Sequence, residues 1–124
     1  MKVMNPVLPG FNPDPSLVRV GDDYYIATST FEWFPGICIH HSKDLVNWEI
    51  LSYALTDETK FDIKGMDTAC GIWAPNLTYD NGTFYLIYTI VYTNRNRFKD
   101  THNFMVTASD PKGPWSDPIP LNKT

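Results

Sequence analysis

One carboxylate in this sequence is flanked by prolines on both sides, in the run Asn-Pro-Asp-Pro-Ser at residues 12–16. A residue that precedes proline is pushed out of the α region, so Asp14 is predicted to lie on a stiff, extended segment. A general base needs such a fixed direction, because its carboxylate must point at a water molecule before the substrate arrives. The same spacing is also compatible with a turn in which Asp14 caps backbone amides.

A second candidate is the run Phe-Glu-Trp-Phe-Pro-Gly at residues 31–36, which places bulky and charged side chains in one loop. Aromatic rings such as that of Phe31 stack on the apolar faces of sugars, whose axial C–H bonds suit a π surface. The alternative is a loop that is buried under its own aromatics. Glu32 is interpreted either as a hydrogen-bond partner of a sugar hydroxyl or as a solvated acid.

The segments around these residues belong to a sequence repeat. Pro15 matches Pro75 and Tyr25 matches Tyr85, both at an offset of 60 residues. The offset grows to 67 residues further along the chain, and the additional residues fall in the polar stretch 94–100, which predicts a loop insertion. Two copies of one supersecondary unit explain this pattern better than chance.

Each copy is predicted to form a sheet of short antiparallel strands. Phe, Trp and Tyr make up 15% of the 124 residues and there are 10 prolines, a composition that favours strands over helices. The run Asp-Asn-Gly at residues 80–82 predicts a tight hairpin, because Asn-Gly readily takes positive φ. The strands are placed near residues 17–20, 24–30, 36–41 and 48–51 in the first copy, and near 83–92 and 104–109 in the second.

A four-stranded unit that repeats about every 60 residues is typical of the blades of a β-propeller. The fold class is therefore predicted to be all-β, with a first blade at about residues 12–55 and a second at about residues 72–121. A propeller removes exposed sheet faces by closing a ring of about four to eight blades. Two blades are accordingly interpreted as part of a longer protein, or as a unit that pairs through its open blade face with further copies or another chain.

The third candidate opens the second copy, in the run Gly-Ile-Trp-Ala-Pro at residues 71–75. Because this run ends in the counterpart of Pro15, Trp73 and Ala74 are predicted to lie in the second blade where Asp14 and its neighbour lie in the first. In a propeller both segments lie at the same end of the central channel, so Asp14 and Trp73 are expected within reach of one small ligand. A core position for Trp73 is the competing interpretation.

Composition argues against several other kinds of protein. The net charge is −4, and the one basic cluster, Arg95, Arg97 and Lys99, lies in a polar stretch and is predicted to be solvated, so no nucleic-acid partner is expected. The sequence has no apolar run of about 20 residues, and no membrane partner is expected. No apolar stretch typical of a signal peptide follows the first residues, which predicts a cytoplasmic protein. Cys38 and Cys70 are predicted to be small buried residues.

Four stretches, taken together and in this order, resemble glycoside hydrolase family 43, and within it the β-xylosidases: residues 5–16, 28–36, 41–48 and 71–75. The likeness covers nearly the whole chain. It implies a five-bladed β-propeller with inverting chemistry in its central pocket, of which this chain supplies about the first two blades. It also implies pentose oligosaccharides that contain xylose or arabinose as substrates, with α-L-arabinofuranosidases and arabinanases as near neighbours in specificity.

The resemblance also implies roles for matching positions. An aspartate at the position of Asp14 is the general base that activates water, and Phe31, Trp73 and Ala74 match positions that line the sugar-binding pocket. A second aspartate and a glutamate that acts as general acid belong to later blades, beyond Thr124. General-acid assistance is worth about 10²–10⁴-fold, so this chain alone is expected to have little or no hydrolase activity.

Other interpretations stay open on the sequence alone. One is a non-catalytic sugar-binding or assembly module that keeps the propeller scaffold, and another is a structural piece that oligomerises through its open face. No cofactor and no metal site are predicted, although the resemblance leaves open an ion in the central channel. His40 and His41 are predicted to point to opposite faces of a strand and therefore not to ligate one metal.

Overall fold

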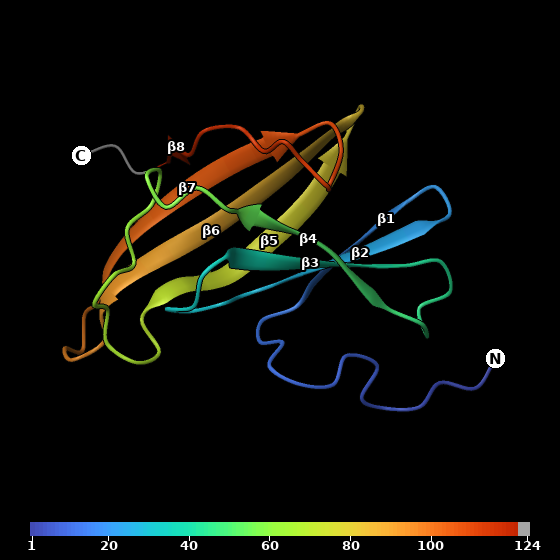
Figure 1. Cartoon of the computed structure of the whole chain (residues 1–124), viewed down its shortest axis with the longest axis horizontal. Coiled ribbons are helices and arrows are strands. Elements are labelled where there is room, and N and C mark those ends of the chain that lie inside the picture. The colour runs from blue at the N-terminus through green and yellow to red at the C-terminus, as the bar shows by residue number, and fades with distance from the viewer. Residues whose placement is uncertain (122–124) are drawn as a thin grey trace.

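The computed structural model of this chain describes residues 1–121 and consists of β-strands and connecting loops (Figure 1). Eight strands form two four-stranded antiparallel sheets, in each of which neighbouring strands follow one another along the chain. This arrangement confirms the predicted all-β class. The strands are β1 (Ser16–Val20), β2 (Asp23–Thr28), β3 (Gly36–Ser42), β4 (Glu49–Leu55), β5 (Gly71–Asp80), β6 (Thr83–Thr93), β7 (Asp100–Ala108) and β8 (Ile119–Pro120).

The first sheet, β1–β4, has two different faces, because successive side chains of a strand point to opposite sides. Ala27 and Ile39, which are paired across β2 and β3, have no exposed surface and belong to the core shared by both sheets. Their sequence neighbours Thr28 and Cys38 are also paired and lie on the other face of the sheet. One face therefore packs against the second sheet, and the other is turned away from it.

The second sheet, β5–β8, contains the hairpin predicted from its Asn-Gly turn. Asn81 and Gly82 have φ values of 46° and 85°, and β5 pairs with β6 on either side of them. The loop between β6 and β7 covers residues 94–99, where the sequence repeat predicts an insertion. The last strand, β8, pairs with β7 through Ile119 and Pro120, and Trp115, which precedes it, packs against the core.

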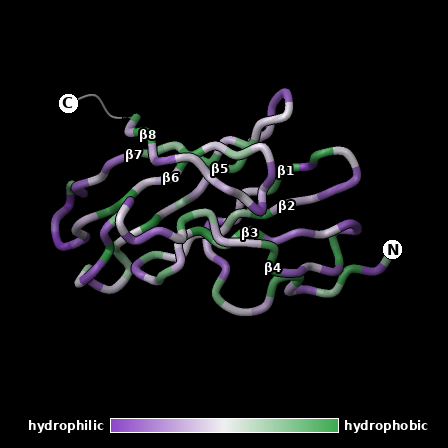
Figure 2. Tube along the Cα trace, turned by 45° about the horizontal axis from the view of Figure 1, so that its top comes forward, coloured by the Kyte–Doolittle hydropathy of each residue, from purple (hydrophilic) through white to green (hydrophobic). Residues whose placement is uncertain are grey.

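Apolar side chains from both sheets form one continuous core. Burying a side chain of this size is worth about 1.5–3 kcal/mol relative to leaving it in water. In Figure 2 hydrophobic segments lie along the strands of both sheets, among hydrophilic ones. The core side chains with no exposed surface include Ile37 and Ile39 of β3, Ile72 of β5, Leu86 of β6 and Val106 of β7.

Polar contacts fix the position of one sheet against the other. The backbone N–H of Leu77 donates to Oγ of Ser16 at 3.0 Å, and Oγ of Ser52 donates to the carbonyl of Pro111 at 2.6 Å. Each contact joins the first sheet or its edges to the second sheet or its loops. The two sheets therefore meet in a defined register, which sets the distance between segments at their common end.

Two remaining observations concern the chain as a whole. Residues 1–121 contain no helix long and apolar enough to cross a bilayer. Cys38 and Cys70 are buried free thiols, as predicted.

Candidate functional site

Asp14 lies just before β1, and its side chain is exposed to solvent. Its φ of 52° lies in the left-handed region, so the prediction of an extended backbone at this residue is wrong. The reason is a pair of contacts with Ser29, whose backbone N–H donates to the carbonyl of Pro13 at 3.0 Å and whose Oγ donates to Oδ2 of Asp14 at 3.3 Å. Ser29 is only 1% exposed, so a rigid position holds the carboxylate.

Phe31 connects the two sheets. Its backbone N–H donates to the carbonyl of Ile72 at 3.0 Å, and its carbonyl accepts from the N–H of Ile72 at 2.9 Å. The ring of Phe31 lies 5.6 Å from the ring of Phe11, and 6.2 Å from that of Trp73 at an angle of 78°. The predicted sugar-binding aromatics are therefore in contact, although they lie in different sheets.

The glycine before Ile72 allows the two backbones of this bridge to come close together. Gly71 has a φ of 89°, and a Cβ atom at this position would lie 2.2 Å from the carbonyl oxygen of Phe31. Real Cβ atoms do not approach a backbone oxygen so closely, so an alanine would force the bridge apart. This close contact determines how Phe31 and the start of β5 are placed.

Trp73 and Ala74 lie in an irregular part of β5, where the pairing with β6 shifts register between Trp73 and Asn76. Bulges of this kind bend a strand and redirect its side chains, and they are common beside functional sites. The indole of Trp73 is half-buried and its Nε1–H donates to the carbonyl of Ala69 at 2.8 Å. Ala74 is exposed and has a φ of 37°.

Three of the four predicted site residues have a strained backbone. Asp14, Phe31 and Ala74 are non-glycine residues with positive φ. Each such conformation costs about 1–3 kcal/mol and persists only where the surrounding structure fixes it, which is typical of functional sites. The sequence alone gives no sign of this strain, because none of the three is glycine or asparagine.

Glu32 binds a backbone group of another loop. Neither interpretation from the sequence, a partner of a sugar hydroxyl or a solvated acid, includes this contact. Oε2 of Glu32 accepts a hydrogen bond from the backbone N–H of Ala69 at 3.1 Å. Ala69 lies in the loop between β4 and β5, residues 56–70. Arg95, from the second sheet's loop between β6 and β7, also holds this loop, because its guanidinium binds both carboxylate oxygens of Asp67 at 2.7 and 2.9 Å. The side chain of Arg95 is 76% exposed, as predicted for a solvated residue, and its ion pair holds the pKa of Asp67 below its usual range.

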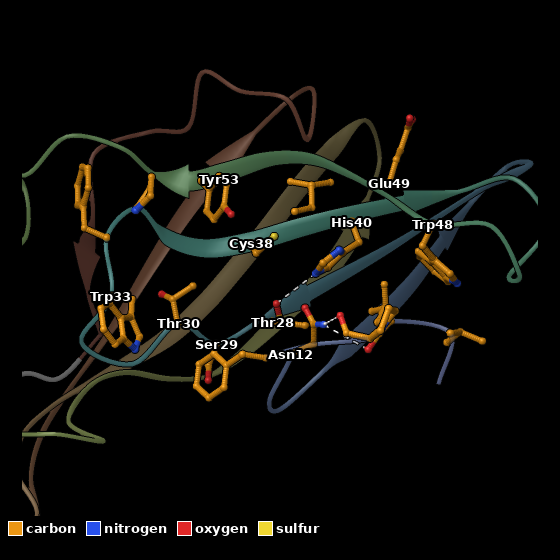
Figure 3. A pocket seen from close by; sticks show the side chains of 17 residues that line it. Asn12, Thr28, Ser29, Thr30, Trp33, Cys38, His40, Trp48, Glu49 and Tyr53 are labelled. Atoms are coloured by element: carbon orange, nitrogen blue, oxygen red, sulfur yellow. Dashed lines mark hydrogen bonds between the residues drawn. The ribbon is translucent and has the colours of Figure 1, made fainter. Parts of the chain in front are cut away.

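A hollow of about 440 Å³ lies on the face of the first sheet that is turned away from the second sheet (Figure 3). Thr28, Cys38 and His40 line it from the sheet, and Asn12 lines it from the N-terminal segment. Ser29 also lines the hollow, but Asp14, Phe31 and Trp73 do not. The hollow is therefore adjacent to the candidate site but does not include Asp14.

The two neighbouring histidines have different surroundings, as predicted for opposite faces of β3. Nε2 of buried His40 lies 3.4 Å from the hydroxyl of Thr28, and burial lowers the pKa of His40. His41 Nε2 lies 2.6 Å from a carboxylate oxygen of Asp23. Among residues 1–121 there is no group of three or more His, Cys, Asp or Glu side chains placed to hold a metal ion.

The structure brings together the four predicted site residues through a continuous series of contacts. This series runs from Asp14 to Ser29, through the following residues to Phe31, and from there to Trp73 and the adjacent Ala74. Sequence reasoning missed Ser29, Phe11 and Gly71 as participants. All three lie inside the motif stretches, but their roles depend on contacts between distant segments.

Comparison with known proteins places these segments in context. The sequence profile of Glycosyl hydrolases family 43 matches residues 3–124. A xylosidase/arabinosidase 43B of Humicola insolens is 56% identical over 99% of the chain, and a β-xylosidase of Bacillus subtilis strain 168 is 55% identical over 100% of it. The crystal structure of a xylan β-1,4-xylosidase from Bacillus halodurans C-125 superposes with a TM-score of 0.95, at 62% identity over 98% of the chain.

The matched region is a small part of each relative. The chain spans 23% of the length of both curated relatives and 23% of the crystallised chain. The crystallised neighbours are five-bladed β-propellers. The two sheets thus correspond to the N-terminal part of such a propeller.

Proposed function

Because this chain belongs to Glycosyl hydrolases family 43, we propose that it supplies the general base and part of the sugar-binding wall of an inverting glycoside hydrolase. The observation that supports this most directly is the placement of Asp14, an exposed carboxylate held by buried Ser29 in a strained conformation. A contact series leads from it to the aromatic pair Phe31 and Trp73. A carboxylate beside an aromatic wall is what hydrolysis of a bound sugar requires.

In the proposed reaction Asp14 accepts a proton from water as that water attacks the anomeric carbon. Inverting enzymes place this base about 6.5–9.5 Å from a general acid, which leaves room for the water behind the sugar ring. The acid protonates the leaving oxygen, and the family resemblance places it in a later blade. We propose that these 124 residues alone have little or no hydrolase activity for this reason.

The proposed substrates are oligosaccharides that contain xylose or arabinose. The names of the relatives support this class, since they are called β-xylosidase and xylosidase/arabinosidase. Phe31, Trp73 and Ala74 are proposed to line the pocket for the terminal sugar. A non-catalytic binding module is less well supported, because the similarity includes every motif stretch and reaches 56% identity with a protein named as an enzyme.

The function can be tested in a chimera in which this chain replaces the matching 124 residues of the Bacillus subtilis β-xylosidase, to which it is 55% identical. We expect the chimera to hydrolyse nitrophenyl-β-xyloside and xylobiose within about tenfold of the parent enzyme, because the relative supplies the later blades. Steady-state kinetics would measure this. A chimera that folds cooperatively but has no xylosidase or arabinosidase activity would contradict the proposed function.

For the 124-residue chain studied by itself, we propose that it self-associates through the open face of the first sheet. Ile50 is 60% exposed beside the hollow, and exposed Phe11 and Trp33 line the same hollow. Exposed apolar side chains that gather in one place are normally covered by a partner. Because the chain spans 23% of its relatives, the blades that follow in those proteins are not present to cover it.

Multi-angle light scattering tests the self-association. We expect an average mass above that of one chain at micromolar concentration, and a return to one chain in Ile50→Asp, because the new charge would be buried without a partner. Phe98→Asp is the matched control, since Phe98 is 85% exposed and lies in the loop between β6 and β7. If the parent chain is monomeric, or if both variants change the average mass equally, self-association through the open face of the first sheet is contradicted.

A further inference from the structure

We propose that Glu32 is a positioning residue that fixes the indole of Trp73 by way of the backbone of Ala69. The inference rests on the proposed function, in which Trp73 forms part of the sugar-binding wall. Glu32 belongs to the loop between β2 and β3 of the first sheet, whereas Trp73 belongs to β5 of the second. One blade would therefore control the orientation of an aromatic ring in the next.

Two hydrogen bonds on one residue carry the proposal. Oε2 of Glu32 accepts from the backbone N–H of Ala69 at 3.1 Å, and the carbonyl of Ala69 accepts from Nε1–H of Trp73 at 2.8 Å. Both distances are within the usual range for an N–H donor and an oxygen acceptor. The backbone of Ala69 thus lies between a fixed carboxylate and the indole.

The backbone conformation of Ala69 explains why a contact from Glu32 matters. Ala69 lies in a turn that one hydrogen bond closes, from the N–H of Cys70 to the carbonyl of Asp67 at 3.0 Å. The φ of Ala69 is 66°, in the left-handed region, which an alanine leaves readily because of its Cβ atom. The hydrogen bond to the Glu32 carboxylate is charge-assisted and hence stronger than one between neutral groups.

Two further side-chain contacts of residues 67–69 come from the loop between β6 and β7 of the second sheet. Arg95 binds Asp67, and Nδ2 of Asn94 donates to the carbonyl of Thr68 at 3.2 Å. These contacts hold residues 67–69 to the second blade. Glu32 adds a contact from the first blade, and it follows directly after Phe31, the ring that meets Trp73 edge to face.

The consequence for a ligand concerns affinity rather than the chemical step. Removing the carboxylate would release the N–H of Ala69 and let the backbone of this residue leave its left-handed conformation. The carbonyl that accepts from the indole N–H would then move away. A sugar that stacks on the ring would then have to fix the indole itself, at a cost in binding free energy. Asp14 has a separate support in Ser29, so the proton transfer would keep its geometry.

The decisive measurement is the NMR signal of the Trp73 indole N–H in the 124-residue chain, assigned with Trp73→Phe. In Glu32→Ala we expect this signal to move and its hydrogen exchange to quicken about tenfold, as for loss of one hydrogen bond. Trp48 is an internal reference, because its Nε1–H donates to the carbonyl of Leu45 at 3.1 Å, in another part of the first sheet. Glu32→Gln should largely restore the signal, since its amide oxygen can still accept.

Glu58→Gln is the matched control. Glu58 is an exposed acid that lies near Lys64, at 3.6 Å, and lines the same small hollow as Glu32. It should leave the Trp73 signal in place. If the Trp73 signal does not move in Glu32→Ala, the proposal is overturned. A second measurement needs no variant: if the backbone N–H of Ala69 in the unaltered chain exchanges its hydrogen as fast as an unstructured amide, the proposal is overturned as well.

Kinetics of the chimera extend the test to substrate. Glu32→Ala should raise KM about tenfold and change kcat less than about twofold, because the ring acts on binding. An unchanged KM, or an equal loss in kcat, would overturn the positioning role. An inactive chimera would count against the proposed function, whereas the NMR result would still decide the link between Glu32 and Trp73.

Discussion

In the chimera with the Bacillus subtilis enzyme, Asp14→Asn is expected to lower kcat by about 10²–10⁴-fold, the usual contribution of a general base. Asparagine keeps the shape of the side chain and can still accept the hydrogen bond from Ser29, but it cannot take a proton from water. KM should change much less, because binding of the sugar depends on the aromatic wall. Initial rates on nitrophenyl-β-xyloside at saturating substrate measure the effect.

Asp22→Asn is the control for Asp14→Asn. Asp22 is an exposed aspartate in the turn between β1 and β2, at the other end of β1 from Asp14. Both variants should unfold at the temperature of the parent, because exposed isosteric changes alter stability by less than about 0.5 kcal/mol. If Asp14→Asn keeps more than about a tenth of the activity, Asp14 is not the base.

Gly71→Ala is expected to destabilise the 124-residue chain by more than about 3 kcal/mol. The added methyl group would meet the carbonyl of Phe31 at 2.2 Å in a backbone with φ of 89°. Both the strain and the clash would act on the bridge that joins the two sheets. Urea unfolding followed by circular dichroism gives the free energy of unfolding.

Gly82→Ala separates the effect of backbone strain from the effect of the steric clash. Gly82 has nearly the same φ, 85°, but a Cβ atom there would meet nothing within 4 Å. Its replacement should cost about 1 kcal/mol, from backbone strain alone. Equal losses in the two variants would show that the close contact between Gly71 and Phe31 contributes nothing to stability.

The features that the sequence predicts well are local or repeated. Asn81-Gly82 determines its own hairpin, because few other pairs take positive φ so easily. The matching of Tyr25 with Tyr85 correctly indicates two similar four-stranded units. The polar stretch after β6 is a loop because it has neither the alternation of a strand nor the apolar side chains of a core.

The features that it does not predict depend on contacts between distant segments. The left-handed backbone of Asp14 follows from its neighbour in space, Ser29, and the prolines beside it indicate an extended chain instead. Glu32 has its partner in a loop 37 residues away, which no spacing rule specifies.

The proximity of the candidate residues was predictable, although their geometry was not. The correspondence between Pro15 and Pro75 places Asp14 and Trp73 at equivalent points of two repeats. The irregular pairing in β5 then determines where the indole points. Repeats predict which segments meet, and the departures from the repeat determine how their side chains meet.

The hairpin turns offer attachment points that are remote from the proposed pocket. β1 runs for 5 residues from the neighbourhood of Asp14 to the turn that contains Gly21, and β5 runs for 10 residues from Gly71 to the turn that contains Gly82. At about 3.3 Å per residue these strands separate each turn from the site by about 17 and 33 Å. A dye, an affinity tag or a tether to a solid support placed in either turn would leave the mouth of the pocket free for sugar chains.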